Sequence, residues 1–452
     1  MLYKVKKERL FTNRQLLALL WPLIIEQALG VLVGMADTVM VSSVGEAAIS
    51  GVSLVDMINQ LIITVFGALA TGGAVVTSQH LGAKRPEEAA RSAGQLVGLS
   101  GILGTAVAVF CLVTRTAQLR LFFGTISEDV MQACLTYFTI TALSFPFLAL
   151  YNAGAAIFRS TGNSAVSMKV SVLVNAINFC GNALCVFVLR MGVAGVAVPT
   201  LVSRAVGAVI ILSLAARRDY TLRITPRTVT RLEGRTVRSI LYIGIPSAFE
   251  NSLFQLGRVL VVSMISLFGT VHISANAVAN NLDAVGCIVG NAMGLAMITV
   301  VGRCVGAQDF EQTKHYTKKL LLWDYIAQGT VNLLVLLFLN RILGMYTLSP
   351  ETRALSWTLV MIHNGVAILL WPAGFVLPNA LRAANDVRFT MVTSILSMIV
   401  WRMGLSWILC VNMGMGAVGV WLAMVVDWIC RVTCFVIRFA SGAWQKSAMK
   451  KV

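Results

Sequence analysis

Two carboxylates occur in the first long apolar run of the chain, residues 15–40. They are Glu26 and Asp37. Their spacing is almost three full turns of an α-helix, so both lie on one face, about 16 Å apart along its axis. An ionisable side chain inside a long apolar helix usually faces a cavity or a partner. Both carboxylates are therefore candidates for holding a cation or a proton, and the alternative for Glu26 is a solvated position near a helix end.

Three asparagines follow at helical spacing in the apolar run 165–189. Asn175, Asn178 and Asn182 are three and four residues apart, which places their amides on one face of a helix. Amide oxygens bind hard cations when a carboxylate such as Asp37 supplies the charge. Hydrogen bonding between helices is an equally common use of buried asparagine, so the spacing leaves both interpretations open.

The second half of the chain carries Glu250 and Arg258 in the apolar run 239–267. They are about two helical turns apart and roughly on one side, so they either pair with each other or find separate partners. For other ionisable residues in apolar runs, structural ion pairing is the expected role. These residues are Asp56, Arg204, Asp283, Asp324, Arg402 and Asp427.

Motifs for bond-making chemistry are missing from the sequence. It contains no GxxxxGK(S/T) phosphate loop, no HExxH metal motif and no GxSxG nucleophile elbow. Its four histidines are not clustered. We therefore expect no enzyme activity, no cofactor and no use of ATP, so that any work must draw on an ion gradient or on the gradient of the substrate.

The composition requires a lipid-facing surface. Of 452 residues, 57% are hydrophobic and only 12% are charged, and the mean hydropathy is +0.81. Soluble domains carry about 25% charged residues. The net charge of +17 lies mostly between apolar runs, where it sets membrane topology and meets anionic lipid. It does not indicate nucleic-acid binding.

Helix-length apolar runs recur along the whole chain. A membrane-spanning helix needs about 20 mainly apolar residues. Runs of that kind fall near 15–40, 51–79, 92–114, 131–157, 165–189, 193–216, 239–267, 275–301, 319–340, 354–380, 388–412 and 416–440. The sequence therefore predicts an all-α polytopic membrane protein with twelve transmembrane helices.

Lys and Arg are concentrated in alternate connections between these runs. The connection after the sixth run holds seven arginines between 217 and 238, whereas the connections on the opposite side hold at most two each. Basic residues mark the cytoplasmic side. We therefore expect a multi-pass protein of the bacterial inner membrane with both termini in the cytoplasm.

The chain repeats itself with a nearly constant offset. Pro22 recurs as Pro246 and Glu26 as Glu250, with the same separation in both pairs. That separation also relates Gly45 to Gly269, Ile49 to Ile273, Ser50 to Ser274, Gly82 to Gly306, Ala83 to Ala307, Met191 to Met415, Gly192 to Gly416 and Gly195 to Gly419, and a single slip in register aligns FRSTGN with LRAAND. Parallel repeats suggest two pseudo-symmetric lobes that rock around a central cavity. We predict a six-helix N-lobe over 1–216, a cytoplasmic Arg-rich linker over 217–238 and a six-helix C-lobe over 239–452.

Several segments spread over nearly the whole chain carry a family resemblance. They are WPLIIEQ, GMADTVMVSSVGEAAISGVSL, VVTSQHLGAKRPEEAAR, FRSTGNSAVSMKVSVLVNAINFCGN, GVAGVAVPTLVSR, YIGIPSAFENSLFQLGR, LRAANDVRFTMVTSILSMIVWRMGLSWIL and GAVGVWLAM. Together they resemble the MATE (multidrug and toxin extrusion) family, of the bacterial NorM/DinF kind. The resemblance implies twelve helices in two V-shaped bundles and export of organic cations by antiport with Na⁺ or H⁺.

The resemblance also implies a coupling site in the N-lobe. Family members bind the cation with an Asp of the first helix, an Asn and an Asp of the fifth helix and a Thr of the sixth. The matching residues here are Asp37, Asn178, Asn182 and Thr200. Asn182 replaces a carboxylate, which leaves one charge in the site. This weakens the expectation of tight Na⁺ binding there and is compatible with simple protonation of Asp37.

The lobes are expected to be unequal. In the C-lobe, the Glu of the seventh helix in some family members matches Glu250, but their Asp of the tenth helix aligns with Trp371. The repeat offset places Val261 opposite Asp37. We therefore expect ion coupling in the N-lobe, with Glu26, Asn175, Glu250 and Arg258 as further candidates for substrate or ion coupling.

The expected protein is a monomeric antiporter whose partners are small organic cations and the lipid bilayer. One alternative in the same superfamily is a flippase or exporter of lipid-linked or polysaccharide substrates. A second alternative, from a different class, is a membrane-embedded transferase, which would need converging catalytic motifs.

Overall fold

The computed structural model describes residues 9–124, 126–217, 220 and 222–449, and in these residues the chain is helical without strands. The helices of the first half are α1 (Asn13–Ser42), α2 (Glu46–Gly82), α3 (Pro86–Phe123), α4 (Glu128–Leu143), α5 (Phe145–Ser160), α6 (Ser164–Ala183), the π-helical η1 (Leu184–Val188), α7 (Ala194–Ala215) and the short α8 (Pro226–Thr230). Those of the second half are α9 (Gly234–Ser266), α10 (Thr270–Gly286), α11 (Ile288–Gly306), α12 (Phe310–Leu337), α13 (Leu339–Gly344), α14 (Pro350–Trp371), η2 (Pro372–Val376), α15 (Leu377–Ala383), α16 (Val387–Ser397), η3 (Met398–Leu405), η4 (Trp407–Asn412), α17 (Gly416–Ala440) and α18 (Trp444–Ala448).

Consecutive helices join into the rods that the apolar runs predict. Among the described residues, ten helical segments are long and apolar enough to cross a membrane, and α4 with α5 make an eleventh, bent by 45°. Pro146 lies in the first turn of α5, where its missing N–H is tolerated. The remaining predicted span, the run 239–267, lies in α9, which is 33 residues long but not apolar enough to be among the segments just counted. The predicted all-α polytopic fold is confirmed.

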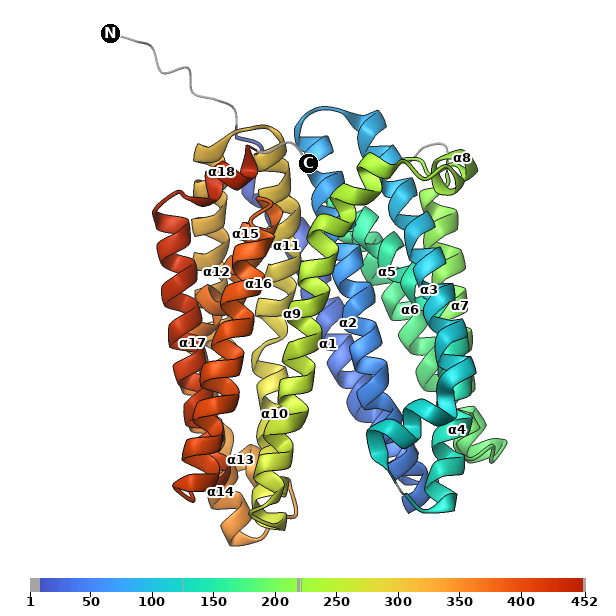
Figure 1. Ribbon diagram of the computed structural model, residues 1–452, viewed down its shortest axis with the longest axis vertical. Helices are drawn as coiled ribbons and strands as arrows, with labels where there is room; N and C mark the ends of the chain where they lie inside the picture. Colours follow the sequence, from blue (N-terminus) through green and yellow to red (C-terminus); the bar gives the residue numbers. More distant parts are fainter. Residues whose placement is uncertain (1–8, 125, 218–219, 221, 450–452) are drawn as a thin grey trace.

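The rods form two bundles that lie side by side (Figure 1). One bundle contains α1–α7 and the other α9–α17, and α2 packs along α9 and α11 between them. The crossing is close because a Cβ on Gly72 of α2 would lie 2.5 Å from the carbonyl oxygen of Ile240 on α9. The division at 217–238 stays a prediction; within that segment, the Gln95 side chain of α3 binds the backbone of Thr228 and Glu233.

Contacts that repeat between the lobes join them at one end of the molecule. Gln79 at the end of α2 donates to the carbonyl oxygen of Ala383 in the C-lobe at 2.9 Å. Arg303 at the end of α11 donates to the carbonyl oxygen of Ser160 in the N-lobe at 2.8 Å. A Cβ on Gly82 would lie 2.0 Å from the Arg303 carbonyl oxygen, and one on Gly306 would lie 1.9 Å from that of Gln79. We call these contacts the interlobe latch.

Both described chain ends lie at the latch end. Phe11 binds the hydroxyl of Tyr316 on α12, which starts just after α11 ends. Trp444 of α18 packs edge-on against Phe310 at the start of α12, with ring centroids 5.8 Å apart. The outermost residues of the predicted cytoplasmic tails, 1–8 and 450–452, lie outside the described residues.

Candidate functional site

The four residues of the predicted N-lobe cation site lie together. Asn182 Nδ2 donates to Asp37 Oδ1 at 2.8 Å and to Asn178 Oδ1 at 3.3 Å. Asn178 Nδ2 in turn donates to the hydroxyl of Thr200 at 3.0 Å. Residues of α1, α6 and α7 are thereby joined in one polar chain, which ends on the carbonyl oxygen of Val196.

Small and cyclic residues bring these helices together. A Cβ on Gly181 of α6 would lie 2.8 Å from the ring of Pro199 on α7, so a larger residue would push α7 away. That contact holds Thr200, the residue after Pro199, against Asn178. The helix changes to the π-helical turn η1 directly after the asparagine chain. Such turns are frequent at functional sites.

A cavity of about 330 Å³ opens onto this polar chain. Asp37 is half-buried, whereas Asn182 is fully buried. The cavity is lined mainly by α1, α2, α6 and α7, and its polar residues are Asp37, Thr38, Ser53, Asp56, Asn59, Gln60, Tyr137, Asn175, Asn178, Thr200, Ser203 and Arg204. An ion or a proton that enters the cavity therefore reaches the carboxylate of Asp37 before the buried amides.

Asp56 is a second carboxylate in the same cavity, and its sequence context indicates only ion pairing. Tyr137 and Asn59 each donate to Asp56 Oδ1 at 3.1 Å. Arg204 lies near enough to act on Asp56 electrostatically and is held by the hydroxyl of Ser144 at 2.7 Å. Asp56 thus has two hydrogen-bond donors and a nearby cation, whereas the hydrogen bond that the structure describes for the Asp37 carboxylate comes from the Asn182 amide.

Asn175 and Glu26 do not join the Asp37 contacts. Asn175 lines the cavity but donates to the hydroxyl of Ser171. Glu26 is in an ion pair with Arg159 at 3.4 Å and accepts from Ser167 at 2.8 Å. The solvated alternative for Glu26 is wrong, because its side chain is only 11% exposed and is paired.

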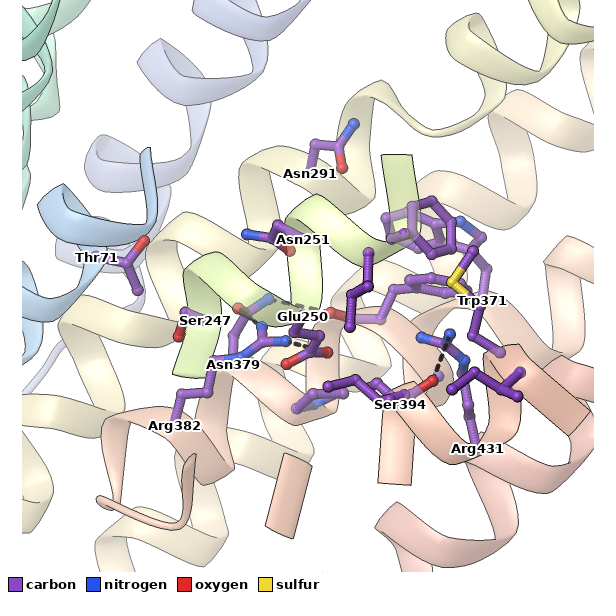
Figure 2. Close-up of a pocket in the computed structure, with 18 of the residues that line it drawn as sticks. Thr71, Ser247, Glu250, Asn251, Asn291, Trp371, Asn379, Arg382, Ser394 and Arg431 are labelled. Atoms are coloured by element: carbon purple, nitrogen blue, oxygen red, sulfur yellow. Dashed lines mark hydrogen bonds and ion pairs between the residues drawn. The ribbon is translucent and has the colours of Figure 1, made fainter. Parts of the chain in front are cut away.

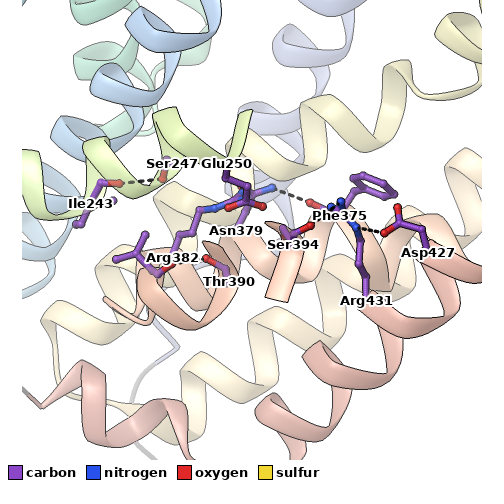
Figure 3. A network of polar contacts seen from close by, with 11 residues as sticks. Ile243, Ser247, Glu250, Phe375, Asn379, Arg382, Thr390, Ser394, Asp427 and Arg431 are labelled. Atoms are coloured by element: carbon purple, nitrogen blue, oxygen red, sulfur yellow. Dashed lines mark hydrogen bonds and ion pairs between the residues drawn. The ribbon is translucent and has the colours of Figure 1, made fainter. Parts of the chain in front are cut away.

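Glu250 pairs with Arg382, and Glu26 pairs with Arg159. The two arginines hold the same place in the aligned segments FRSTGN and LRAAND. Glu250 Oε1 accepts from Arg382 at 2.7 Å, and Arg382 also donates to Asn379 at 2.8 Å (Figure 3). The possible pair between Glu250 and Arg258 does not form. Arg258 is exposed on α9 and acts electrostatically on Asp283 instead.

A second cavity, of about 310 Å³, surrounds Glu250 in the C-lobe (Figure 2). Trp371 stacks on Phe375 with ring centroids 5.1 Å apart, and both line this cavity. The guanidinium of Arg431 lies 5.6 Å from the rings of Phe254 and Phe375. Thr71 of the N-lobe completes the lining, so the cavity faces the interface between the lobes.

The residues around Asp37 could hold one small cation. Asp37 supplies a negative charge, and Asn178, Asn182 and Thr200 supply neutral oxygens of the kind that hard cations accept. In this arrangement, however, the Asn182 amide directs its nitrogen at Asp37, and its oxygen has no hydrogen-bond partner among the described residues. A proton on Asp37 needs no such oxygen.

Two helical lobes, with polar cavities at and beside their interface, define a polytopic membrane transporter. The chain belongs to the MatE family, whose profile matches residues 22–184 in the first repeat and residues 246–408 in the second. It is a MATE efflux transporter in its sequence and in its fold.

Relatives extend over nearly the whole chain. It is 27% identical over 444 residues to the uncharacterized transporter YisQ of Bacillus subtilis, covering 96% of this chain and 95% of YisQ. It is 24% identical to the probable multidrug resistance protein NorM of Thermotoga maritima, covering 99% of this chain and 96% of NorM.

Solved structures share the fold. An outward-facing multidrug resistance MATE family transporter of the MOP superfamily superimposes with a TM-score of 0.89 at 20% identity, covering 96% of each chain. A MOP superfamily transporter of Pyrococcus furiosus, described as having a binding pocket of reverse polarity, superimposes with a TM-score of 0.88 at 21% identity, covering 97% of each chain.

Proposed function

We propose that this chain is a secondary active antiporter that exports organic cations from a bacterial cell in exchange for H⁺ or Na⁺. It works as a monomer in the inner membrane with both termini in the cytoplasm. The observation that carries the proposal is the half-buried carboxylate of Asp37, bound by Asn182 at the wall of the N-lobe cavity.

Asp37 couples ion and substrate through its charge. The ionised carboxylate favours a cationic substrate near the N-lobe cavity, and protonation or cation binding removes that attraction. Because the ion and the substrate then prefer different states of the protein, a gradient of one drives movement of the other.

The local geometry favours H⁺ over Na⁺ as the coupling ion. Na⁺ would need the Asn182 amide to turn its oxygen toward Asp37, which breaks the 2.8 Å hydrogen bond. The nearby Asp56 already accepts hydrogen bonds from Tyr137 and Asn59 and lies near Arg204. A proton can neutralise Asp37 without turning the Asn182 amide and without displacing the partners of Asp56.

The C-lobe cavity supports an aromatic or cationic substrate. Trp371, Phe375 and Phe254 offer ring faces, which attract organic cations. Glu250 Oε2 is buried and has no hydrogen-bond partner among the described residues. It is therefore available to a donor group of a substrate.

The interlobe latch supports alternating access. The latch closes the end at which the described termini lie, and the similar solved transporter is outward-facing. Access from the cytoplasm then requires Gln79 and Arg303 to release the opposite lobe.

The test is efflux of a fluorescent organic cation from proteoliposomes, with the Na⁺ gradient and the pH gradient imposed separately. We expect the pH gradient alone to drive movement of the dye. A flippase of lipid-linked substrates would leave the dye in place under both gradients, and that result would reject the proposal.

A further inference from the structure

A carboxylate–imidazole pair with a buried imidazole lies in the C-lobe, away from Asp37 and outside the Glu250 cavity lining. Asp283 of α10 and His363 of α14 approach to 2.7 Å between Oδ1 and Nε2. The side chain of His363 is 2% exposed and that of Asp283 is 24% exposed. Cys287 donates its thiol hydrogen to the same Asp283 oxygen at 3.1 Å.

A chain of amides fixes which nitrogen of His363 carries a hydrogen. Asn332 Nδ2 faces two backbone carbonyl oxygens, of Gly286 at 3.1 Å and of Gln328 at 2.9 Å. Its Oδ1 must therefore face Asn364, whose Nδ2 donates to it at 2.9 Å. The Asn364 oxygen is then left to face His363 Nδ1 at 3.3 Å. An amide oxygen only accepts, so Nδ1 of His363 carries a hydrogen.

The contact on the other side of the ring then needs a second hydrogen. With Nδ1 protonated, a neutral imidazole has a bare lone pair at Nε2. That lone pair would face the carboxylate oxygen of Asp283 across 2.7 Å, which is repulsive. We propose that the Asp283–His363 pair is a second proton-binding site of this transporter, located in the C-lobe and separate from Asp37.

Charged groups of four neighbouring elements, α9, η3, α12 and α17, lie in this part of the C-lobe. Arg258 of α9 and Arg402 of η3 act on Asp283, and Asp324 of α12 acts on Cys287. On α17, Asp427 is paired with Arg431 at 3.0 Å. Although the Asp283, Cys287 and His363 donor atoms are close together, the two arginines oppose a divalent ion there. They stabilise ionised Asp283 when the single positive charge of the proton leaves.

Release of the proton moves helices. The Nε2–H bond breaks, its electron pair stays on the ring, and the proton passes to water at the exposed edge of Asp283. The remaining lone pair repels Asp283, so α10 and α14 must separate at this level. On the far side, His363 contacts Trp428 at 4.9 Å between ring centroids, and Trp428 contacts Phe375 of the Glu250 cavity at 5.6 Å. The protonation state therefore reaches the wall of the proposed substrate cavity.

The first test measures how many protons exchange for each substrate in proteoliposomes. The reversal potential of dye exchange gives this number for the full-length wild type and for His363→Gln, whose amide still donates to Asp283. We expect His363→Gln to exchange one proton fewer while exchange itself persists. His315→Gln, at an exposed histidine of α12, is the control and should match the wild type. An unchanged proton number in His363→Gln would overturn the proposal.

The second test does not depend on transport or on a variant of His363. Nitrogen NMR of ¹⁵N-histidine-labelled full-length protein in nanodiscs reports the hydrogens on each ring nitrogen. Each of His80, His272 and His315 is replaced in turn to assign its signal. The remaining signal then belongs to His363. We expect His363 to lose a hydrogen from Nε2 as pH rises and to keep Nδ1–H. A neutral His363 with its hydrogen on Nε2, or a ring that never titrates, would overturn the proposal even if the Asp37 account holds.

Discussion

Gln79 and Arg303 occupy equivalent positions of the two sequence repeats, and each caps a helix end of the opposite lobe. Gln79 binds the Ala383 carbonyl oxygen and Arg303 binds the Ser160 carbonyl oxygen. The two acceptors are themselves related by the repeat, since Ser160 and Ala383 hold the same place in FRSTGN and LRAAND. The latch is therefore a pseudo-symmetric pair of polar contacts, and loss of either half should weaken closure at that end.

The latch predicts that small residues are required where α2 and α11 meet. Gly82→Val places a side chain where even a Cβ lies 2.0 Å from the Arg303 carbonyl oxygen, so the helices must separate. We expect spin labels at the exposed Glu87 and Glu311 to move apart in electron paramagnetic resonance distance measurements. Gly67→Val is the control on the same helix, because a Cβ at Gly67 meets nothing within 4 Å. Equal label distances in both variants would contradict the latch.

The amide at position 182 predicts the ion preference of the site. Asn182→Asp adds a second carboxylate beside Asp37, to which Asn182 now donates. We expect a Na⁺ gradient to drive dye exchange at least about tenfold faster in this variant than in the wild type, since paired carboxylates favour a hard cation. Asn175→Asp is the control, because Asn175 binds Ser171 and not Asp37. If a Na⁺ gradient did not raise the rate of dye exchange in Asn182→Asp, another residue would determine the ion preference.

The Glu250–Arg382 pair predicts a large loss of stability when one partner is neutralised. The side chains are 8% and 13% exposed, and Glu250→Gln leaves the Arg382 charge buried without its carboxylate. Breaking a buried pair in this way costs about 3 to 5 kcal/mol. Unfolding in mixed detergent micelles measures the change.

The matched control for that stability loss is an exposed pair of the same chain. Glu233 lies 3.3 Å from Arg91, and their side chains are 46% and 49% exposed. Glu233→Gln should change the unfolding free energy by no more than about 1 kcal/mol, as expected for surface pairs. Similar losses in Glu250→Gln and Glu233→Gln would mean that burial of the pair is not what stabilises the C-lobe.

Most of the architecture could be predicted because apolar runs report directly on spans. The run 239–267 reports its span less directly, since α9 is not among the helices apolar enough to count as spans by composition alone, and its place in the repeat supports the prediction. The grouping of Asn178 and Asn182 on one helix face follows from their spacing, the carboxylate in the first apolar run singles out Asp37, and the family resemblance adds Thr200. Their role in ion coupling stays a proposal.

The contacts that sequence could not predict join residues far apart in the chain. Arg382 lies 132 residues from Glu250, and helical spacing offers Arg258 as the nearer partner. The latch binds backbone carbonyl oxygens, which any residue type supplies, so no side-chain pattern marks it. The hydrogen positions on His363 depend on the carbonyl oxygens of Gly286 and Gln328, and these are placed only by packing of the helices.

The most direct measurement for the central claim is proton-driven dye exchange by Asp37→Asn in proteoliposomes. The account predicts that a pH gradient drives exchange much more slowly in this variant than in the wild type, because only the proposed C-lobe proton site remains, while the protein stays folded. Asp129→Asn, at an exposed carboxylate at the start of α4, should behave as the wild type. Gradient-driven exchange at the wild-type rate in Asp37→Asn would contradict the assignment of Asp37 as the coupling residue.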